Sequence, residues 1–288
     1  MASGKTSKAV RNARSSIVVN KPKPWGMIAA VVTVLVFAGA VFGYSYRQWD
    51  IQQDKEAALA AYTPSEENKD PSDKIQGVEK IDYSDSRGHV DATQRVAYDK
   101  FPPFGGPHDA TWAACNGVVY ADPVRNENMV HPLEHGAVWI AYNADQVTGP
   151  ALDTLKAKVE GEQHIMLSPY PDLDKPISLQ SWGHQLKLDS ADDPRIDQFI
   201  RALRVNPYQY PEVGGTCDPT PGTWNVDAPS PFVGTEPGPD AVPMTGGTPP
   251  TDAPAGQPPA TDPSATIDPS APSAPAATTA PPPTSATG

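Results

Sequence analysis

The chain has 288 residues, of which 38% are hydrophobic and 19% charged, and it contains 35 prolines. This composition predicts one folded domain with flexible ends rather than two packed domains. The net charge of −12 argues against nucleic acid as a partner, because nucleic-acid-binding proteins present a basic face.

The chain begins with a basic segment followed by an apolar one. Residues 1–24 contain Lys and Arg but no Asp or Glu, and residues 26–46 carry no charged side chain. A helix of about 20 residues spans about 30 Å, the thickness of a bilayer core. Trp25 and Tyr46 stand at its ends, where aromatic rings favour the membrane interface. We therefore predict a transmembrane helix over residues 25–46, with the lipid bilayer as its partner.

The basic segment also predicts the orientation. By the positive-inside rule, residues 1–24 lie in the cytoplasm and the chain after Arg47 lies outside, as in a single-pass plasma-membrane protein. A cleaved signal peptide is the alternative, since Ala38-Gly39-Ala40 matches the small-residue cleavage pattern. The uncleaved anchor is favoured because the apolar run continues past Ala40 and the preceding basic segment is long.

The two cysteines, Cys115 and Cys217, then lie in an oxidising compartment, where two cysteines most often pair. A Cys115–Cys217 bridge would close a loop of about 100 residues, which contributes roughly 4–5 kcal/mol in the chain-entropy model. The alternative is that one thiolate is a metal ligand.

The remaining chain divides into three parts. Residues 47–80 predict a juxtamembrane helix, which Pro64 ends, and then a polar stalk. Residues 219–288 are mostly Pro, Thr, Ala, Ser and Gly and predict a disordered tail, because they cannot bury enough apolar area to offset their ordering entropy. The folded extracytoplasmic domain is therefore expected over residues 81–218.

Strand and helix patterns alternate inside this domain. Buried-strand patterns occupy residues 136–143, 164–170 and 177–188. Amphipathic helix patterns occupy residues 148–161 and 192–204. This order predicts the α+β class, with a small mixed sheet and about two helices.

The segment 131-HPLEH-135 is the strongest candidate for chemistry. On a helix, His131 and His135 would share a face and bind one metal ion. The letters also match the inverted zinc-protease motif H-x-x-E-H, in which the glutamate acts as general base. That motif needs a long helix, whereas Gly136 follows at once and at most one helical turn, starting at Pro132, is expected here. A hydrolase is therefore only the third hypothesis, and a non-enzymatic role is favoured.

A small metal site in loops beside a strand is the leading hypothesis. Neutral imidazoles suit copper and zinc, and a carboxylate serves either as a ligand or as an acceptor that fixes a histidine tautomer. Met129 and Met166 are soft ligands that would suit Cu(I). The candidate metal-binding residues are His89, His108, His131, Glu134 and His135.

A buried hydrogen-bonded network of the same side chains is the competing interpretation, in which the histidines only hold loops together. His164 and His184 fit strand positions and are taken as structural. No Walker, Rossmann, CxxC or serine-protease pattern is present, so we name no catalytic residue.

Several motifs together resemble a known family. The segments are 102-PPFGGPH-108, 112-WAACNGVVY-120, 127-ENMVHPLEHGAVWIAY-142, 168-SPYPDL-173 and 181-SWGHQL-186. In this order they resemble the actinobacterial family called domain of unknown function 3105, over roughly residues 80–218. The resemblance implies a membrane-anchored extracytoplasmic protein and no particular activity. It also implies that the five candidate metal-binding residues occupy family positions, whereas His184, Met129 and Met166 do not.

Taken together, the sequence predicts a membrane-anchored extracytoplasmic protein that binds copper or zinc in a handling or accessory role. The first alternative is a non-catalytic envelope module that docks on a membrane-protein partner, with structural histidines. The second is a metal-dependent hydrolase.

Overall fold

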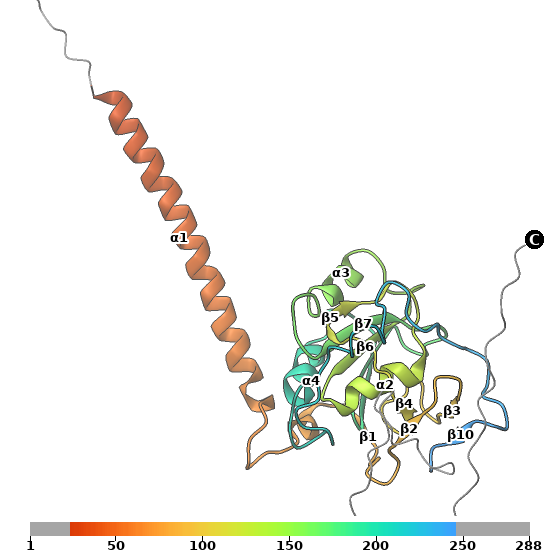
Figure 1. Ribbon diagram of the computed structural model, residues 1–288. Coiled ribbons are helices and arrows are strands. Elements are labelled where there is room, and N and C mark those ends of the chain that lie inside the picture. The colour runs from red at the N-terminus through yellow and green to blue at the C-terminus, as the bar shows by residue number, and fades with distance from the viewer. Residues whose placement is uncertain (1–23, 246–288) are drawn as a thin grey trace, which may run out of the picture.

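The computed structural model describes residues 24–245 (Figure 1). The predicted cytoplasmic segment, apart from its last residue, and residues 246–288 of the predicted tail lie outside the described residues. The first element, α1, runs from Trp25 to Leu59 and projects from the domain as one long rod. It joins the expected membrane-spanning and juxtamembrane helices without a break. It is long and apolar enough to cross a membrane, and its apolar side chains are exposed. Such a helix fits a membrane anchor or a signal sequence.

The sequence predicts a free polar stalk after the juxtamembrane helix. In the structure the second half of the segment after α1 packs on the domain instead. It contains two short 3₁₀ helices, η1 (Ala60–Tyr62) and η2 (Pro71–Lys74), followed by strand β1 (Glu79–Lys80). Ser72 and Ile75 are buried, and β1 pairs antiparallel with β9 (His184–Leu188). The folded domain therefore begins near residue 70 rather than at residue 81.

A six-stranded mixed sheet forms the centre of the domain, which confirms the predicted α+β class. Its order is β1-β9-β8-β6-β7-β5. Strand β7 pairs parallel with both β5 and β6. The other pairs in the sheet, β6–β8, β8–β9 and β9–β1, are antiparallel. The strands of this sheet not yet given a range are β5 (Asn116–Val119), β6 (Val138–Tyr142), β7 (Ile165–Pro169) and β8 (Ile177–Ser181).

The expected strand over residues 177–188 is a hairpin, β8 and β9, with Trp182-Gly183 at its turn. Gly183 has a φ of +70°, and a Cβ there would lie 2.7 Å from the Ile81 carbonyl oxygen. Only glycine combines this backbone conformation with so close an approach. The chain therefore folds back at Gly183 instead of continuing as one strand.

Both faces of the sheet are buried, and β6 shows how its side chains divide between them. Ile140 faces a core with helices α3 (Pro150–Lys156) and α4 (Arg195–Leu203), whereas Trp139 and Ala141 face a second core. Successive strand residues point to opposite faces, so one buried strand serves both cores. The second core contains helix α2 and the loops that carry the histidines (Figure 1).

Helix α2 spans Asn126–Glu134, which is longer than the single turn expected. Pro132 lies inside it and leaves the Asn128 carbonyl without its helical donor. The Ala113 N–H donates to that carbonyl at 2.9 Å instead, so the helix continues through the proline. Gly136, with a φ of +85°, then ends the helix in a Schellman motif, in which Gly136 N–H donates to Leu133 and Ala137 N–H to Pro132.

Two small parallel pairs complete the fold. Strand β2 (His89–Val90) pairs with β4 (His108–Asp109), and β3 (Val96–Ala97) pairs with β10 (Val242–Pro243). The pairing of β10 shows that the domain does not end at residue 218. The prediction of disorder from residue 219 is wrong for residues 219–245, because this stretch contains apolar side chains that pack on the domain. They are Trp224, Phe232, Val242 and Met244.

Candidate metal centre

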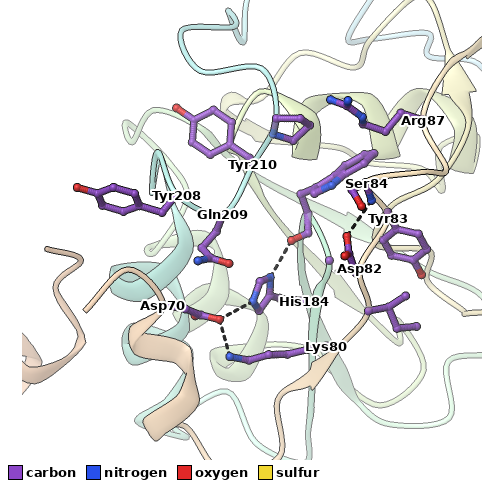
Figure 2. Close-up of a pocket in the computed structure, with 14 residues that line it drawn as sticks. Asp70, Lys80, Asp82, Tyr83, Ser84, Arg87, His184, Tyr208, Gln209 and Tyr210 are labelled. Carbon is purple, nitrogen blue, oxygen red and sulfur yellow. Dashed lines mark hydrogen bonds and ion pairs between the residues drawn. The ribbon is translucent and has the colours of Figure 1, made fainter. Parts of the chain in front are cut away.

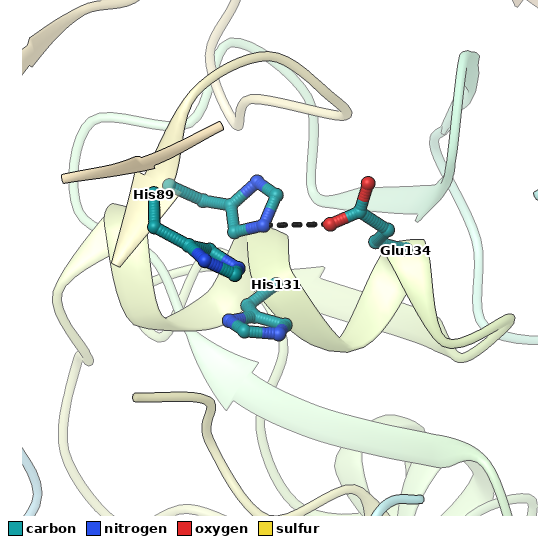
Figure 3. Close-up of side chains that lie close together, drawn as sticks. His89, His131 and Glu134 are labelled. Carbon is teal, nitrogen blue, oxygen red and sulfur yellow. Dashed lines mark ion pairs between the residues drawn. The ribbon is translucent and has the colours of Figure 1, made fainter. Parts of the chain in front are cut away.

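The pairing of β2 with β4 brings the first two histidines together. His89 and His108 are directly opposite each other in this parallel pair, and cross-strand neighbours project to the same face. Helix α2 packs against β4 and adds His131 and, one turn later, Glu134 (Figure 3). The side chains come from three elements far apart in the sequence.

These four side chains form what we call the inner group: His89, His108, His131 and Glu134. One nitrogen or carboxylate oxygen from each lies within 4.8 Å of those from the others. The His131 ring lies 4.9 Å from the His89 ring and 4.6 Å from the His108 ring, measured between centroids. His108 is 0% exposed, and His131 and Glu134 are also buried. The group is therefore compact and largely shielded from water.

The tautomers of two of these histidines are fixed by backbone carbonyls. Nδ1 of His108 lies 2.8 Å from the Gly106 oxygen, and Nδ1 of His131 lies 2.6 Å from the Asp109 oxygen. A carbonyl oxygen only accepts, so each Nδ1 carries the hydrogen and donates. The neutral form of each ring then has its lone pair on Nε2. This is the arrangement by which metal-binding histidines are usually oriented.

The contact between His108 and Glu134 needs a positive charge. Nε2 of His108 lies 2.8 Å from Oε2 of Glu134, but the two atoms are not aligned as a hydrogen bond. In the neutral tautomer both atoms are acceptors and repel each other. Either a second proton on His108 or a bound cation resolves this contact.

The electrostatics of the inner group favour a neutral imidazole and a charged carboxylate. Burial, followed by the neighbouring His108 and His135, holds the pKa of His131 well below its usual 6.5. Burial alone would raise the pKa of Glu134, but His108 and then His89 and Arg87 outweigh it and hold that pKa below its usual value. Both side chains are thus in the protonation state that binds a metal ion.

His131 also belongs to a second set, which we call the outer group: His131, His135 and Glu212. Their candidate ligand atoms again lie within 4.8 Å of one another. Nδ1 of His135 donates to the Thr216 carbonyl at 2.8 Å, and its Nε2 lies 3.1 Å from Oε2 of Glu212. The Glu212 side chain is 48% exposed, so the outer group reaches the surface.

The five residues predicted from the sequence are thus brought together, but not as one set. His135 is outside the inner group, and Glu212 of the outer group is not predicted at all. Glu212 has no motif around it and arrives through the loop that precedes Cys217. The disulfide between Cys115 and Cys217, predicted from the sequence, joins the end of this loop to the residue before β5, and the Glu212 N–H donates to the Glu134 carbonyl at the end of α2.

A buried ion pair lies next to the backbone carbonyl that orients His131. The Arg125 guanidinium pairs with the Asp109 carboxylate, and both residues are buried. The Asp109 carbonyl is the acceptor for Nδ1 of His131. Arg125 also lies 3.2 Å from Glu127, whose carboxylate accepts from the Val96 N–H. This network fixes the backbone that orients His131.

The structure also has a cleft of about 460 Å³, whose lining residues are drawn in Figure 2. Its wall includes Arg87, two residues before His89, and Trp182, whose ring lies 6.0 Å from the His108 ring. His184 lies on the opposite side of this cleft from Arg87 and donates through Nδ1 to the Trp182 carbonyl at 2.7 Å. Its Nε2 lies 3.1 Å from Asp70, so His184 joins β9 to the segment before β1.

His164 and His184 belong to neither histidine group among the described residues, in keeping with the structural roles expected for them. Met129 and Met166 are both fully buried in the apolar core that contains Trp139. Met129 lies two residues before His131 on α2, and two residues turn a helix by about 200°. Its side chain therefore points away from the inner group, which weighs against a thioether ligand.

Comparison with known proteins finds a match to one family model and no indication of an activity. Residues 89–219 match the family described as "Protein of unknown function (DUF3105)". The match covers all the residues of both histidine groups, which supports the resemblance seen in the motifs. No curated protein and no solved structure matches the chain.

Proposed function

We propose that the protein binds one transition-metal ion, copper or zinc, at the inner group, in a metal-handling or accessory role. The observation that carries this proposal is the convergence of three imidazoles and one carboxylate within 4.8 Å, with two of the rings oriented by backbone carbonyls. Three nitrogens and one oxygen form a donor set that suits Zn(II) and Cu(II).

The dimensions of the inner group fit such an ion after small movements. Bonds of about 2.1 Å in a tetrahedron separate the ligand atoms by about 3.4 Å. The group spans up to 4.8 Å, and the His108–Glu134 contact is 2.8 Å. An ion would draw the outer ligands inward and part His108 from Glu134, which requires side-chain adjustments but no rebuilding of β4 or α2.

The direct test is elemental analysis of the full chain, purified in detergent after expression into an oxidising compartment with copper or zinc supplied. We expect about one ion per chain, because the ligands are preformed and the pKa shifts of His131 and Glu134 favour their unprotonated forms. His131→Ala should bind none, since His131 belongs to both groups. His108→Ala should weaken metal binding by at least about 100-fold. Mutating a residue that only hydrogen-bonds to a metal ligand already lowers metal affinity 10–100-fold, and losing the ligand itself costs more.

The control variant is His164→Asn, which removes a histidine outside both groups and keeps a residue type that tolerates the positive φ of 53°. It should retain the ion. Circular dichroism and the Cys115–Cys217 disulfide should be unchanged in all variants. A folded, disulfide-bonded wild-type chain that binds neither metal would overturn the proposal.

The two alternatives predict other outcomes. A docking module with structural histidines predicts no metal and co-purification of a membrane-protein partner, with the His108–Glu134 contact serving as an ion pair. A hydrolase predicts that Glu134→Gln keeps the metal and loses activity. We favour binding without hydrolysis because His131 and His135 share a group with Glu212, whereas Glu134 belongs to the inner group.

We further propose that α1 is an uncleaved anchor that places the domain on the outer side of the plasma membrane. The disulfide supports an oxidising location, and the apolar side chains of α1 support insertion. Intact-mass measurement of the membrane fraction tests this. A full-length chain is expected, whereas a chain that begins after Ala40 would show a cleaved signal peptide.

A further inference from the structure

We propose that the outer group is the position through which the metal ion enters and leaves the inner group. This inference rests on the proposed metal binding and concerns the same copper or zinc ion. The outer group offers two imidazoles and a carboxylate, which suffices to hold such an ion transiently. Its Glu212 is the exposed member, whereas the members of the inner group from β4 and α2 are buried.

The H-x-x-E-H spacing on α2 makes the two groups neighbours. His131 lies three residues before Glu134 and four before His135, and both spacings bring side chains together on a helix. Glu134 and His135 are consecutive, so they point in directions about 100° apart. Glu134 therefore reaches the inner group and His135 the outer group, while His131 stands between them.

His131 has only one nitrogen to offer. Its Nδ1 donates to the Asp109 carbonyl, which leaves Nε2 as the single ligand atom. One ion therefore occupies one group or the other, and the two positions exclude each other. Transfer is a ligand exchange in which the ion keeps His131, releases His135 and Glu212, and gains His89, His108 and Glu134. No bond other than the metal–ligand bonds changes, and the ion keeps its oxidation state.

The distances around His131 suit such an exchange. Its ring centroid lies 4.7 Å from that of His135 and 4.6 Å from that of His108. The outer group is also held firmly against the inner one. The Glu212 N–H donates to the Glu134 carbonyl at 3.1 Å, and Thr216, the acceptor of His135, directly precedes the disulfide-bonded Cys217.

The experiment measures rates of metal uptake and release in the full chain, with Zn²⁺ or Cu²⁺ as the probe and a coloured chelator as the competitor. Glu212→Gln is the test variant, because it keeps the side-chain shape at an exposed position. A cleft lined by charge of one sign speeds the association of counter-ions by 10–10³. For the loss of the one exposed carboxylate of the outer group we expect uptake and release to slow by about tenfold, at the lower end of that range. Stoichiometry and affinity should stay those of the wild type, since the inner group is intact.

The matched control is Glu160→Gln, which neutralises an exposed glutamate outside both groups and should leave both rates unchanged. A second test removes an inner ligand. His108→Ala should retain weak binding at the outer group, and adding Glu212→Gln to it should abolish that remainder.

The outcomes separate this inference from the proposed function. One ion bound at wild-type rates by Glu212→Gln would overturn the entry role and leave the metal site standing. Two ions bound together would overturn the mutual exclusion. A wild-type chain without metal would overturn both proposals. Slowed exchange at unchanged affinity, together with loss of binding in the double variant, would support the inference.

Discussion

Asp109 illustrates how a single residue serves both stability and the site. Its carboxylate pairs with Arg125 in the protein interior, and its carbonyl orients His131. Removing one partner of a buried ion pair leaves the other charge uncompensated, which is far more costly than breaking a pair at the surface.

Asp109→Asn should therefore destabilise the fold by about 2–3 kcal/mol, below the usual 3–5 because Arg125 retains Glu127 as a partner. Chemical denaturation of the purified chain measures this. The matched control is Asp189→Asn, which breaks an exposed pair with Lys175 and should cost less than about 1 kcal/mol. Equal losses in the two variants would contradict the structural role given to Asp109.

Asp70 makes a prediction about pH. Burial by itself would raise the pKa of its carboxyl, but hydrogen bonds from His184, Lys80 and Ser72 outweigh it and hold that pKa well below 3.8. The folded state thus keeps Asp70 charged at a pH where the unfolded chain binds a proton. Its contribution to stability is present above about pH 4 and is lost as the pH falls below that value.

Comparison of wild type with Asp70→Asn isolates this contribution from that of the other carboxyl groups. The variant should be less stable at pH 6, and the difference in melting temperature should shrink steadily towards pH 2. Parallel melting curves over this range would show that Asp70 does not carry the expected linkage.

Helix α2 sets the geometry of both histidine groups, and its end depends on Gly136. The φ of +85° is strained for any residue with a Cβ, and a Cβ there would lie 2.7 Å from the Tyr210 ring. Gly136→Ala should therefore cost more than the roughly 1 kcal/mol of a left-handed alanine, and it should weaken metal binding by displacing Glu134, the inner-group ligand at the end of α2.

Gly161→Ala is the control, since Gly161 has a similar φ of +81° but no atom within 4 Å of the added Cβ. The difference in unfolding free energy between the two variants measures the contact with Tyr210. If both variants lose the same stability and bind metal equally well, the close packing of Gly136 against Tyr210 contributes neither to stability nor to metal binding.

The elements that sequence patterns predict correctly are those formed by local periodicity. The apolar run at residues 136–143 becomes β6, and the stripe at residues 192–204 becomes α4. Helix α2 is underestimated because a proline normally ends a helix, and nothing local reveals that Ala113 supplies the missing donor. The hairpin at Trp182-Gly183 is missed because apolar and polar residues alternate on both sides of the turn, and this pattern resembles one strand.

The candidate site shows the same division. The histidines stand out as a residue type, so all members of the inner group are named from the sequence. Their division into two groups is not predictable, because it depends on the β2–β4 pairing and on Glu212, which lies more than 70 residues beyond α2. Long-range contacts of this kind leave no periodic signal in the chain.

At the scale of the whole molecule, the C-terminal stretch braces the part of the domain that carries the site. Arg95 donates to the Val233 and Thr235 carbonyls, and the Val242 N–H donates to the Arg95 carbonyl at 2.8 Å. The next residue, Val96, donates its N–H to Glu127 at the start of α2. The stretch is thus connected to α2 through β3.

A chain that ends at residue 219 should therefore be less stable than one that ends at residue 245. It loses the side chains of Trp224, Phe232, Val242 and Met244 from the core. At about 1.5–3 kcal/mol for each fully buried side chain we expect a loss of roughly 4–7 kcal/mol, since three of them are only partly buried. That is a large share of a typical stability of about 5–15 kcal/mol. Thermal melting of the two truncated chains, each retaining α1, measures the difference. Equal melting temperatures would mean that residues 220–245 lie on the domain without stabilising it. A lower melting temperature for the chain that ends at residue 219 would place the end of the folded domain at β10.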